Sequence, residues 1–518
     1  NAEYMGIIYK LHKGNSGHRE FIITCFSDQK TVVYIGGMVE CKTKMMVSPQ
    51  MSNSDLRVSI PEDFSFKPIT NASPVAASDS ACIAYEQYLR IPEITSLWSA
   101  REFPAWRNEP LLRPSFMALE FSFHLISTVM RDRRTYSNVG QWRRRLESLT
   151  ASQSRIISEV VEAEDADSET RGTAPIVDMR DAGGIVPGRK GSHAEVWKAA
   201  DGVVTAVSTT SEESLLPRLA AWRKSENVAE RIMSSIECYM GRCPYTLGLG
   251  EPNLAGKPKV DYDAVCRPGE LARLMKLPPH NNVESQTVYS VLQIFECWIQ
   301  VGREILAALV VDKIESKRFK EASDGCYLLE QIWKLLMEVS DLLLLADPDD
   351  FLRLKNQLLA NPLDTAPFCF RSRALVELTK SCKDLRQKVP EILGVEVDPK
   401  GGPRVQEAAM TLYLSGKRKE GESEKIHLLQ GLQSLEKTSK GFYYGYKQLM
   451  VVLLGSLDAN GNKAVSVSLS EDGNGLAQMF LQPTYFPSLD AAKTFVGDSW
   501  RRECDSKLSR RSVFPNNL

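Results

Sequence analysis

The stretch PSFMALEFSFHLISTVM, residues 114–130, indicates a helix that must be buried on all sides. One set of apolar residues recurs at the three- and four-residue spacing of a single helix face: Phe116, Leu119, Phe123, Ile126 and Met130. A second set forms another stripe: Met117, Phe121, Leu125 and Val129. Pro114 suits a first helical turn. A helix that is apolar nearly all round belongs at the centre of a bundle, so we expect a helical core.

The same helical period runs through most of the chain. It predicts further helices at 215–241, 281–313, 327–345, 371–389, 404–415, 424–455 and about 488–502. Another helix follows Asp347, which is a suitable N-cap, with Pro348 at the first helical position. The Gly- and Pro-rich residues 242–271 are expected to form a long ordered loop over the helices. No parallel sheet is indicated, so the predicted class is all-α, a multi-helix bundle.

Composition excludes several kinds of partner and site. The 518 residues carry 64 Lys and Arg against 65 Asp and Glu, a formal charge of −1, which disfavours nucleic acid and anionic membranes as partners. The 11 cysteines are an odd number, and Cys238 and Cys243 lack the spacing and the histidines of a zinc site, so no metal is predicted. No apolar run approaches the ~20 residues that span a bilayer. We expect a cytoplasmic protein.

Four parts are predicted along the chain. Residues 1–37 begin with Asn, contain the β-like patches FIITCF and TVVYIGG, and precede Met38. We interpret them as a non-native or disordered extension; the alternative is a genuine short extension. Residues 38–250 are predicted to form an N-terminal helical domain with a mobile insertion at about 161–213, where acidic and Gly-rich segments interrupt the helical period. A C-terminal helical domain, 251–505, and a tail, 506–518, follow.

Motifs of the common enzyme classes do not occur. The sequence lacks a phosphate-binding loop, a Gly-x-Ser-x-Gly elbow, a paired-histidine zinc helix and a kinase signature. We therefore predict no catalytic residues and consider an enzyme the less favoured interpretation.

Six stretches together resemble one family, the plant HSPRO (Hs1pro-1-like) nematode-resistance proteins. They are YLRIPEITSLW, EFPAWRNEPLLRPSFMALE, RCPYTLGLGEPNLAGKPKVDYDAVCRPGEL, YLLEQIWKLLMEVSDLLLLADPDDFLRLKNQL, PFCFRSRALVELTKSCKDLRQKVPEILGVEVDPKGGPRVQEAAM and YFPSLDAAKTF. The resemblance covers about residues 38–500 and departs at 1–37 and much of 170–213. It implies a cytoplasmic protein of basal defence and stress signalling that binds a regulatory subunit of the sucrose-non-fermenting-related, energy-sensing kinase complex. It carries over no catalytic residues.

A fainter resemblance concerns the C-terminal half. DPKGGPRVQEAAMTLY, the helix containing YYGYKQLMVVLL, and EDGNGLAQMFL occur in the order of three segments of the indoleamine and tryptophan dioxygenase superfamily. The resemblance implies a dioxygenase-like fold in this half. It also implies haem-pocket positions at Gly401, Gly402 and Tyr446, with Tyr446 at or beside the axial histidine, and substrate-binding positions at Gly473 and Gly475.

Two readings of the aromatic segment 441–455 remain open. Leu435, Phe442, Tyr446, Leu449 and Leu453 share one helix face, which plain core packing explains without a ligand. The segment contains no histidine, and a phenol ligand disfavours oxygen binding to haem iron, so retained dioxygenase activity is not expected. Arg371 is a further candidate for holding a carboxylate, although surface or interhelix ion pairing also explains it. The resulting hypotheses are a non-catalytic signalling protein and, alternatively, a haem or small-molecule binder.

Overall fold

The computed structural model describes the chain in separate stretches. They are residues 7–13, 19–27, 30–36, 77–103, 106, 108–133, 138–165, 197–198, 204–205, 211–241, 243, 245–251, 260–276, 286–358, 368–396, 404–414, 421–455 and 475–497. The chain divides into two compact units, Asn1–Thr70 and Asn71–Leu518, and each is described by itself.

The first unit contains a three-stranded antiparallel sheet in the order β1-β2-β3. Its strands are β1 (Ile7–Lys13), β2 (Arg19–Ser27) and β3 (Lys30–Gly36), and the register pairs Ile7 with Cys25 and Phe21 with Gly36. The two β-like patches recognised in the sequence lie in β2 and β3. Our interpretation of 1–37 as a disordered extension did not include these paired strands, and its non-native origin stays a prediction.

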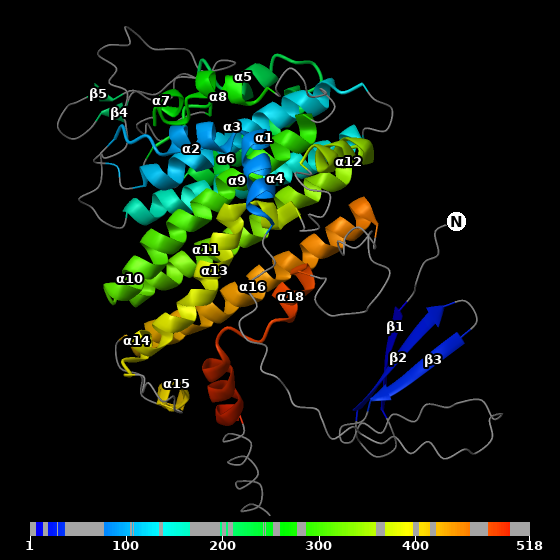
Figure 1. Cartoon of the computed structure of the whole chain (residues 1–518), viewed down its shortest axis with the longest axis vertical. Helices are drawn as coiled ribbons and strands as arrows, with labels where there is room; N and C mark the ends of the chain where they lie inside the picture. Colours follow the sequence, from blue (N-terminus) through cyan, green and yellow to red (C-terminus); the bar gives the residue numbers. More distant parts are fainter. Residues whose placement is uncertain are drawn as a thin grey trace, which may run out of the picture. The chain divides into compact units, whose positions relative to one another are not determined.

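The second unit is almost entirely helical, as the sequence predicted (Figure 1). Its first helices are α1 (Asp79–Leu89), α2 (Ile91–Trp98), α3 (Glu109–Arg131), α4 (Val139–Asp165), α5 (Leu215–Leu219), α6 (Glu226–Met240), α7 (Tyr262–Cys266), α8 (Pro268–Leu274) and α9 (Gln286–Glu304). After α9 come the π-helix η3 (Ile305–Val311), α10 (Asp312–Glu315), α11 (Phe319–Ser340), the 3₁₀ turn η4 (Asp341–Leu345), α12 (Pro348–Gln357), the 3₁₀ turn η5 (Phe368–Arg371), α13 (Arg373–Asp384), the 3₁₀ turn η6 (Leu385–Lys388), α14 (Val389–Leu393), α15 (Arg404–Leu414), α16 (Glu422–Leu454) and α18 (Gly475–Leu481). Residues 487–497 are also helical.

Helix α3 lies at the centre of this unit, and 19 of its residues are buried, as its two apolar stripes predicted. The helix starts earlier than expected. Glu109 is its first residue and Pro110 occupies the first turn, while Pro114 lies inside the helix. Figure 1 shows the short helices α5, α7 and α8 gathered over one side of α3, and α9 packs against α3 as well. The helices that bury α3 therefore come from both halves of the sequence.

The two domains predicted on either side of residue 250 share one hydrophobic core. A single hydrophobic cluster includes Leu119 and Phe123 of α3 as well as Ile294 and Trp298 of α9. A hydrogen bond from Trp298 Nε1 to Gln153 Oε1, 3.0 Å long, also joins α9 to α4. The division into 38–250 and 251–505 therefore stays a prediction about the sequence.

Two predicted irregular regions are partly described. Helix α4 extends to Asp165, so the start of the predicted insertion is helical, and the short strands β4 (Trp197–Lys198) and β5 (Val204–Thr205) pair within it. The rest of 166–210 lies outside the described residues. In the predicted loop 242–271, Leu247 and Leu249 are buried against the helices, and the loop's later part forms α7 and the start of α8.

Helices α11 and α16 pack parallel to each other. Successive contacts run in the same direction along both helices: Cys326 with Gly431, Glu330 with Ser434, Trp333 with Phe442, and Met337 with Gly445. A Cβ atom at Gly445 would lie 2.8 Å from the sulfur of Met337, so glycine permits the close approach. Helix α18 packs on the outer side of α16, where the rings of Tyr444 and Phe480 meet edge to face at 5.4 Å.

No helix in the described ranges has the length and apolar character needed to cross a bilayer.

Two glycine substitutions should have opposite effects on stability. A Cβ at Gly325 of α11 would lie 2.5 Å from the backbone oxygen of Leu309 in the π-helix, so Gly325→Ala should lower the free energy of unfolding by about 1–3 kcal/mol through overpacking. Gly441 of α16 has no atom within 4 Å of such a Cβ, so Gly441→Ala should raise it by about 0.5–1 kcal/mol.

Urea unfolding followed by circular dichroism measures both changes. Equal effects of the two substitutions would contradict the close packing of α11 on the π-helix.

Candidate functional site

The aromatic residues of α16 face three different surroundings. Tyr443 is buried, its hydroxyl lies 2.6 Å from that of Thr379, and its ring stacks on Phe370 at 5.8 Å. Phe442 is also buried, between Phe295 and Trp333. Tyr444 is 54% exposed. The predicted core face is therefore confirmed at Phe442, as it is at Leu435, Tyr446 and Leu449, while Leu453 is only partly buried.

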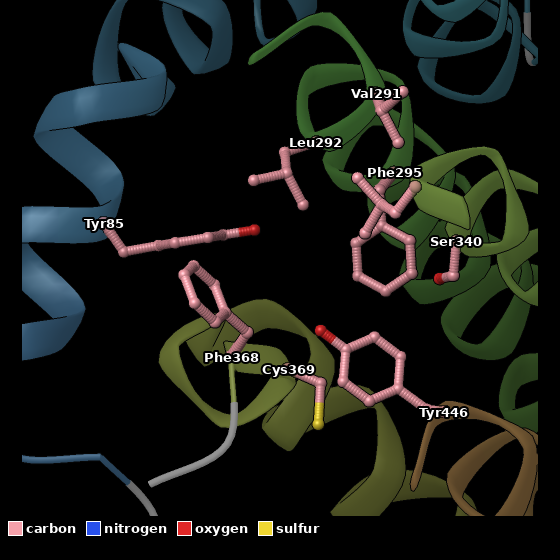
Figure 2. Close-up of a pocket in the computed structure, with 9 residues that line it drawn as sticks. Tyr85, Val291, Leu292, Phe295, Ser340, Phe368, Cys369 and Tyr446 are labelled. Carbon is pink, nitrogen blue, oxygen red and sulfur yellow. The ribbon is translucent and has the colours of Figure 1, made fainter. Parts of the chain in front are cut away.

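Tyr446 lines a small pocket formed by helices that are distant in the sequence. Figure 2 shows the hydroxyl groups of Tyr85 and Tyr446 pointing towards its interior. Apolar side chains supply most of the wall, and the complete lining is Tyr85 of α1, Val291, Leu292 and Phe295 of α9, Ser340 of α11, Leu343 of η4, Phe368 and Cys369 of η5, and Tyr446. Burial raises the pKa of Tyr446 well above its usual value, with a smaller contribution from Cys369, so the phenol is protonated at neutral pH.

The cavity volume of the pocket, counted as the space open to the centre of a water molecule, is about 10 Å³. This is room for roughly one water, whereas drug-sized ligands occupy pockets of about 300–1,000 Å³. In this conformation the pocket cannot admit haem or an amino acid.

A buried carboxyl group lies beside the pocket. Glu296 of α9 is 4% exposed, and its Oε1 accepts a hydrogen bond of 2.8 Å from the hydroxyl of Tyr85. Desolvation raises the pKa of Glu296 to about 7, while hydrogen bonds from Tyr85 and Ser372 oppose this rise. Glu296 thus connects α1, α9 and the start of α13. Tyr85 and Glu296 were not among the predicted site residues, although a glutamate within the apolar run QIFECWI of α9 was a detectable signal.

Arg371 supports one wall of the pocket and does not line it. Its side chain is buried rather than placed in a surface ion pair. Its Nη1 donates a 2.6 Å hydrogen bond to the carbonyl oxygen of Leu358, and its guanidinium lies 5.1 Å from the ring centre of Phe368. Its position fits a structural clamp on η5, and its role as a carboxylate-binding residue stays a prediction.

Of the other predicted positions, Gly401, Gly402 and Gly473 lie outside the described residues. Gly475 is the first residue of α18, the helix that packs beside Tyr444. Among the predicted site residues that the structure describes, Tyr446 lines the pocket and Arg371 and Gly475 do not.

The residues around Tyr446 do not fit haem. Besides the lack of space, no described histidine lines the pocket. His427 lies on the same helix as Tyr446, and α16 is continuous between them, so helix rise separates the two by about 28 Å. His124 of α3 is mostly buried, and its Nε2 has no hydrogen-bond partner in the described residues. A tyrosinate ligand would also require ionisation of Tyr446, which burial disfavours. In the described ranges no three His, Cys, Asp or Glu side chains converge as metal ligands.

A second buried carboxyl group holds the layer of short helices onto α3. Glu120 accepts hydrogen bonds from Ser214 Oγ at 2.8 Å, from the backbone nitrogen of Leu215 at 2.6 Å and from the hydroxyl of Tyr262 at 3.2 Å. Desolvation raises its pKa to about 7. Its described hydrogen-bond partners are all structural groups of the covering layer, so its position fits a packing role.

Comparisons with known proteins match nearly the whole chain. The family models described as Hs1pro-1 N-terminus and Hs1pro-1 protein C-terminus match residues 37–237 and 240–502. The Arabidopsis thaliana protein called nematode resistance protein-like HSPRO2 is 45% identical over 458 residues, 88% of this chain and 95% of that protein. Nematode resistance protein-like HSPRO1 of the same plant is also 45% identical, over 462 residues, 88% of this chain and 98% of that protein.

No solved structure matches the chain. The dioxygenase-like fold of the C-terminal half therefore stays a prediction.

The buried Glu296 should make stability depend on pH. Its folded pKa of about 7 lies above the usual value of 4.5, so its contribution is complete below pH 4.5 and is lost as pH rises through 7. This loss amounts to about 3 kcal/mol in the free energy of unfolding. Glu296→Gln should remove that part of the pH dependence, measured by urea unfolding between pH 4.5 and 8.

Glu377→Gln is the matched control, because Glu377 is exposed and pairs with Arg303 at the surface. A Glu296→Gln profile parallel to that of the natural chain would contradict the burial of this carboxyl group.

The pocket volume predicts that the purified protein shows no stoichiometric haem absorption. Expression with added haem, followed by a search for a Soret band, tests this. A band that disappears in Tyr446→Phe would contradict the prediction and would identify Tyr446 as an iron ligand.

Proposed function

The chain belongs to the Hs1pro-1 family, and we propose that it acts in plant defence and stress signalling as a non-catalytic protein that binds other proteins. The observation that carries this proposal is the one-water size of the pocket beside Tyr446, combined with the nematode-resistance names of relatives that cover almost its full length. An enzyme that acts on small molecules needs a cavity that admits its substrate, whereas a protein that binds other proteins can do so through its surface.

The partner we propose is a regulatory subunit of the sucrose-non-fermenting-related kinase complex, in the cytoplasm. Support comes from the family resemblance of the sequence. The near-neutral net charge of −1 is consistent with recognition of a protein rather than a polyanion.

The alternative function is a haem or small-molecule binder. The inward hydroxyl of Tyr446 and the aromatic wall around it favour this alternative, and the volume of the pocket opposes it. Binding would require the pocket to widen, through displacement of a wall such as η5, which carries Phe368 and Cys369.

The proposed function predicts direct binding of the purified chain to the purified kinase regulatory subunit. We expect a saturable complex by isothermal titration calorimetry. Enlarging the pocket with Phe368→Ala should leave the affinity unchanged within about twofold, because the proposed partner contacts the surface and not the buried wall of the pocket.

The regulatory subunit denatured before titration serves as the negative control. Absence of heat with the native subunit would remove this partner. A strong loss of affinity in Phe368→Ala, with the fold intact by circular dichroism, would instead favour the small-molecule alternative.

A further inference from the structure

Helices α16 and α18, which pack together, each expose large apolar side chains. Tyr444 of α16 is 54% exposed and Leu481 of α18 is 74% exposed. Phe480, the residue before Leu481, is partly buried, and its ring packs against the ring of Tyr444. Val452, two turns further along α16, is 70% exposed. Single exposed apolar residues are common, but an exposed tyrosine in ring contact with a phenylalanine is typical of protein interfaces, which are enriched in aromatic residues. We call Tyr444, Phe480 and Leu481 the α16–α18 patch.

Positive charge borders the α16–α18 patch. Lys447 Nζ lies 5.8 Å from the ring centre of Phe480, and Lys383 of α13 donates to Gln482 Oε1 at 3.4 Å. Neither lysine forms an ion pair with an acidic side chain among the described residues. Lys440 is different, because Glu436 neutralises it at 2.7 Å.

The pKa of Lys383 is lowered, mainly by burial and further by the nearby Arg386, whereas Asp384 opposes the change. The geometry gives the sign of the border: the ammonium groups of Lys383 and Lys447 lie beside α18 without an acidic partner among the described side chains. They can therefore contact carboxylates of a partner.

The chemistry of the surface specifies its occupant. Exposed apolar side chains favour a ligand with large apolar side chains, and the two neighbouring lysines favour acidic residues beside them. An amphipathic helix presents these two features together on one side. Like charges would repel a basic segment, so the border also selects against such partners.

We propose that the α16–α18 patch docks an acidic amphipathic segment of a partner protein, with Tyr444 as the aromatic anchor and Lys383 and Lys447 contacting carboxylates. This inference rests on the proposed function, since it assigns a surface to the protein binding proposed above.

A synthetic helical peptide with Leu and Phe on one face and Glu on both flanks is the probe. Titrated against the full chain by fluorescence anisotropy, it should bind saturably and more weakly as salt is raised, while the same peptide with Lys flanks should not bind. Tyr444→Ala and Lys447→Glu should each weaken binding about tenfold.

The chain offers matched controls. Tyr327 of α11 is 53% exposed, and its neighbour Cys326 contacts Gly431, which helix rise places about 20 Å from Tyr444 along α16. Tyr327→Ala and Lys320→Glu, at an exposed lysine on the same end of α11, should bind the peptide like the natural chain.

Three results would overturn the inference. They are no binding of the Glu-flanked peptide, equal binding by the patch and control variants, and a natural chain that sediments as a dimer while Tyr444→Ala sediments as a monomer. The last would make a second copy of this chain the occupant. Loss of kinase-subunit binding with peptide binding retained would remove only the partner named in the proposed function.

Discussion

The need to cover α3 on every side organises the helical unit. A helix with two apolar stripes exposes hydrocarbon whichever way it turns, and each Å² left in water costs about 25 cal/mol. Neighbouring helices from both halves of the chain meet this need, which explains why one core spans two matched family regions. Polar groups buried in this core need hydrogen-bond partners within the protein, because burial removes them from bulk water. Glu120 and the pair Tyr85–Glu296 are such cases.

These buried carboxyl groups also show that strongly shifted pKa values can have purely structural causes. Perturbed pKa values often mark catalysis, yet structural networks perturb them too. Glu120 contacts only the layer that covers α3, and Glu296 contacts Tyr85 beside a pocket with room for one water. Among the described residues, both carboxyl groups bind structural partners. Their effect is on stability and on how helices are joined.

The sequence predicted the helices better than their surroundings. Periodicity located α16 within two residues at each end, and Asp347 with Pro348 located the start of α12 by local capping chemistry. The split of the predicted helix 371–389 and the π-helix after α9 depend on tertiary packing, which periodicity does not report. At the candidate site, Tyr446 was found because its own helix contains the signal. Tyr85 and Glu296 were missed because the pocket joins residues more than 200 positions apart.

The parallel packing of α11 and α16 has a consequence for biosynthesis. Antiparallel neighbours joined by a short turn can pair as soon as both emerge from the ribosome. Here Trp333 must wait for Phe442, so the apolar side of α11 stays uncovered while roughly a hundred further residues are translated, a delay of several seconds at typical rates. During that interval the nascent chain exposes an apolar surface to chaperones and to other nascent chains. A chain truncated before α16 would expose this surface of α11 permanently.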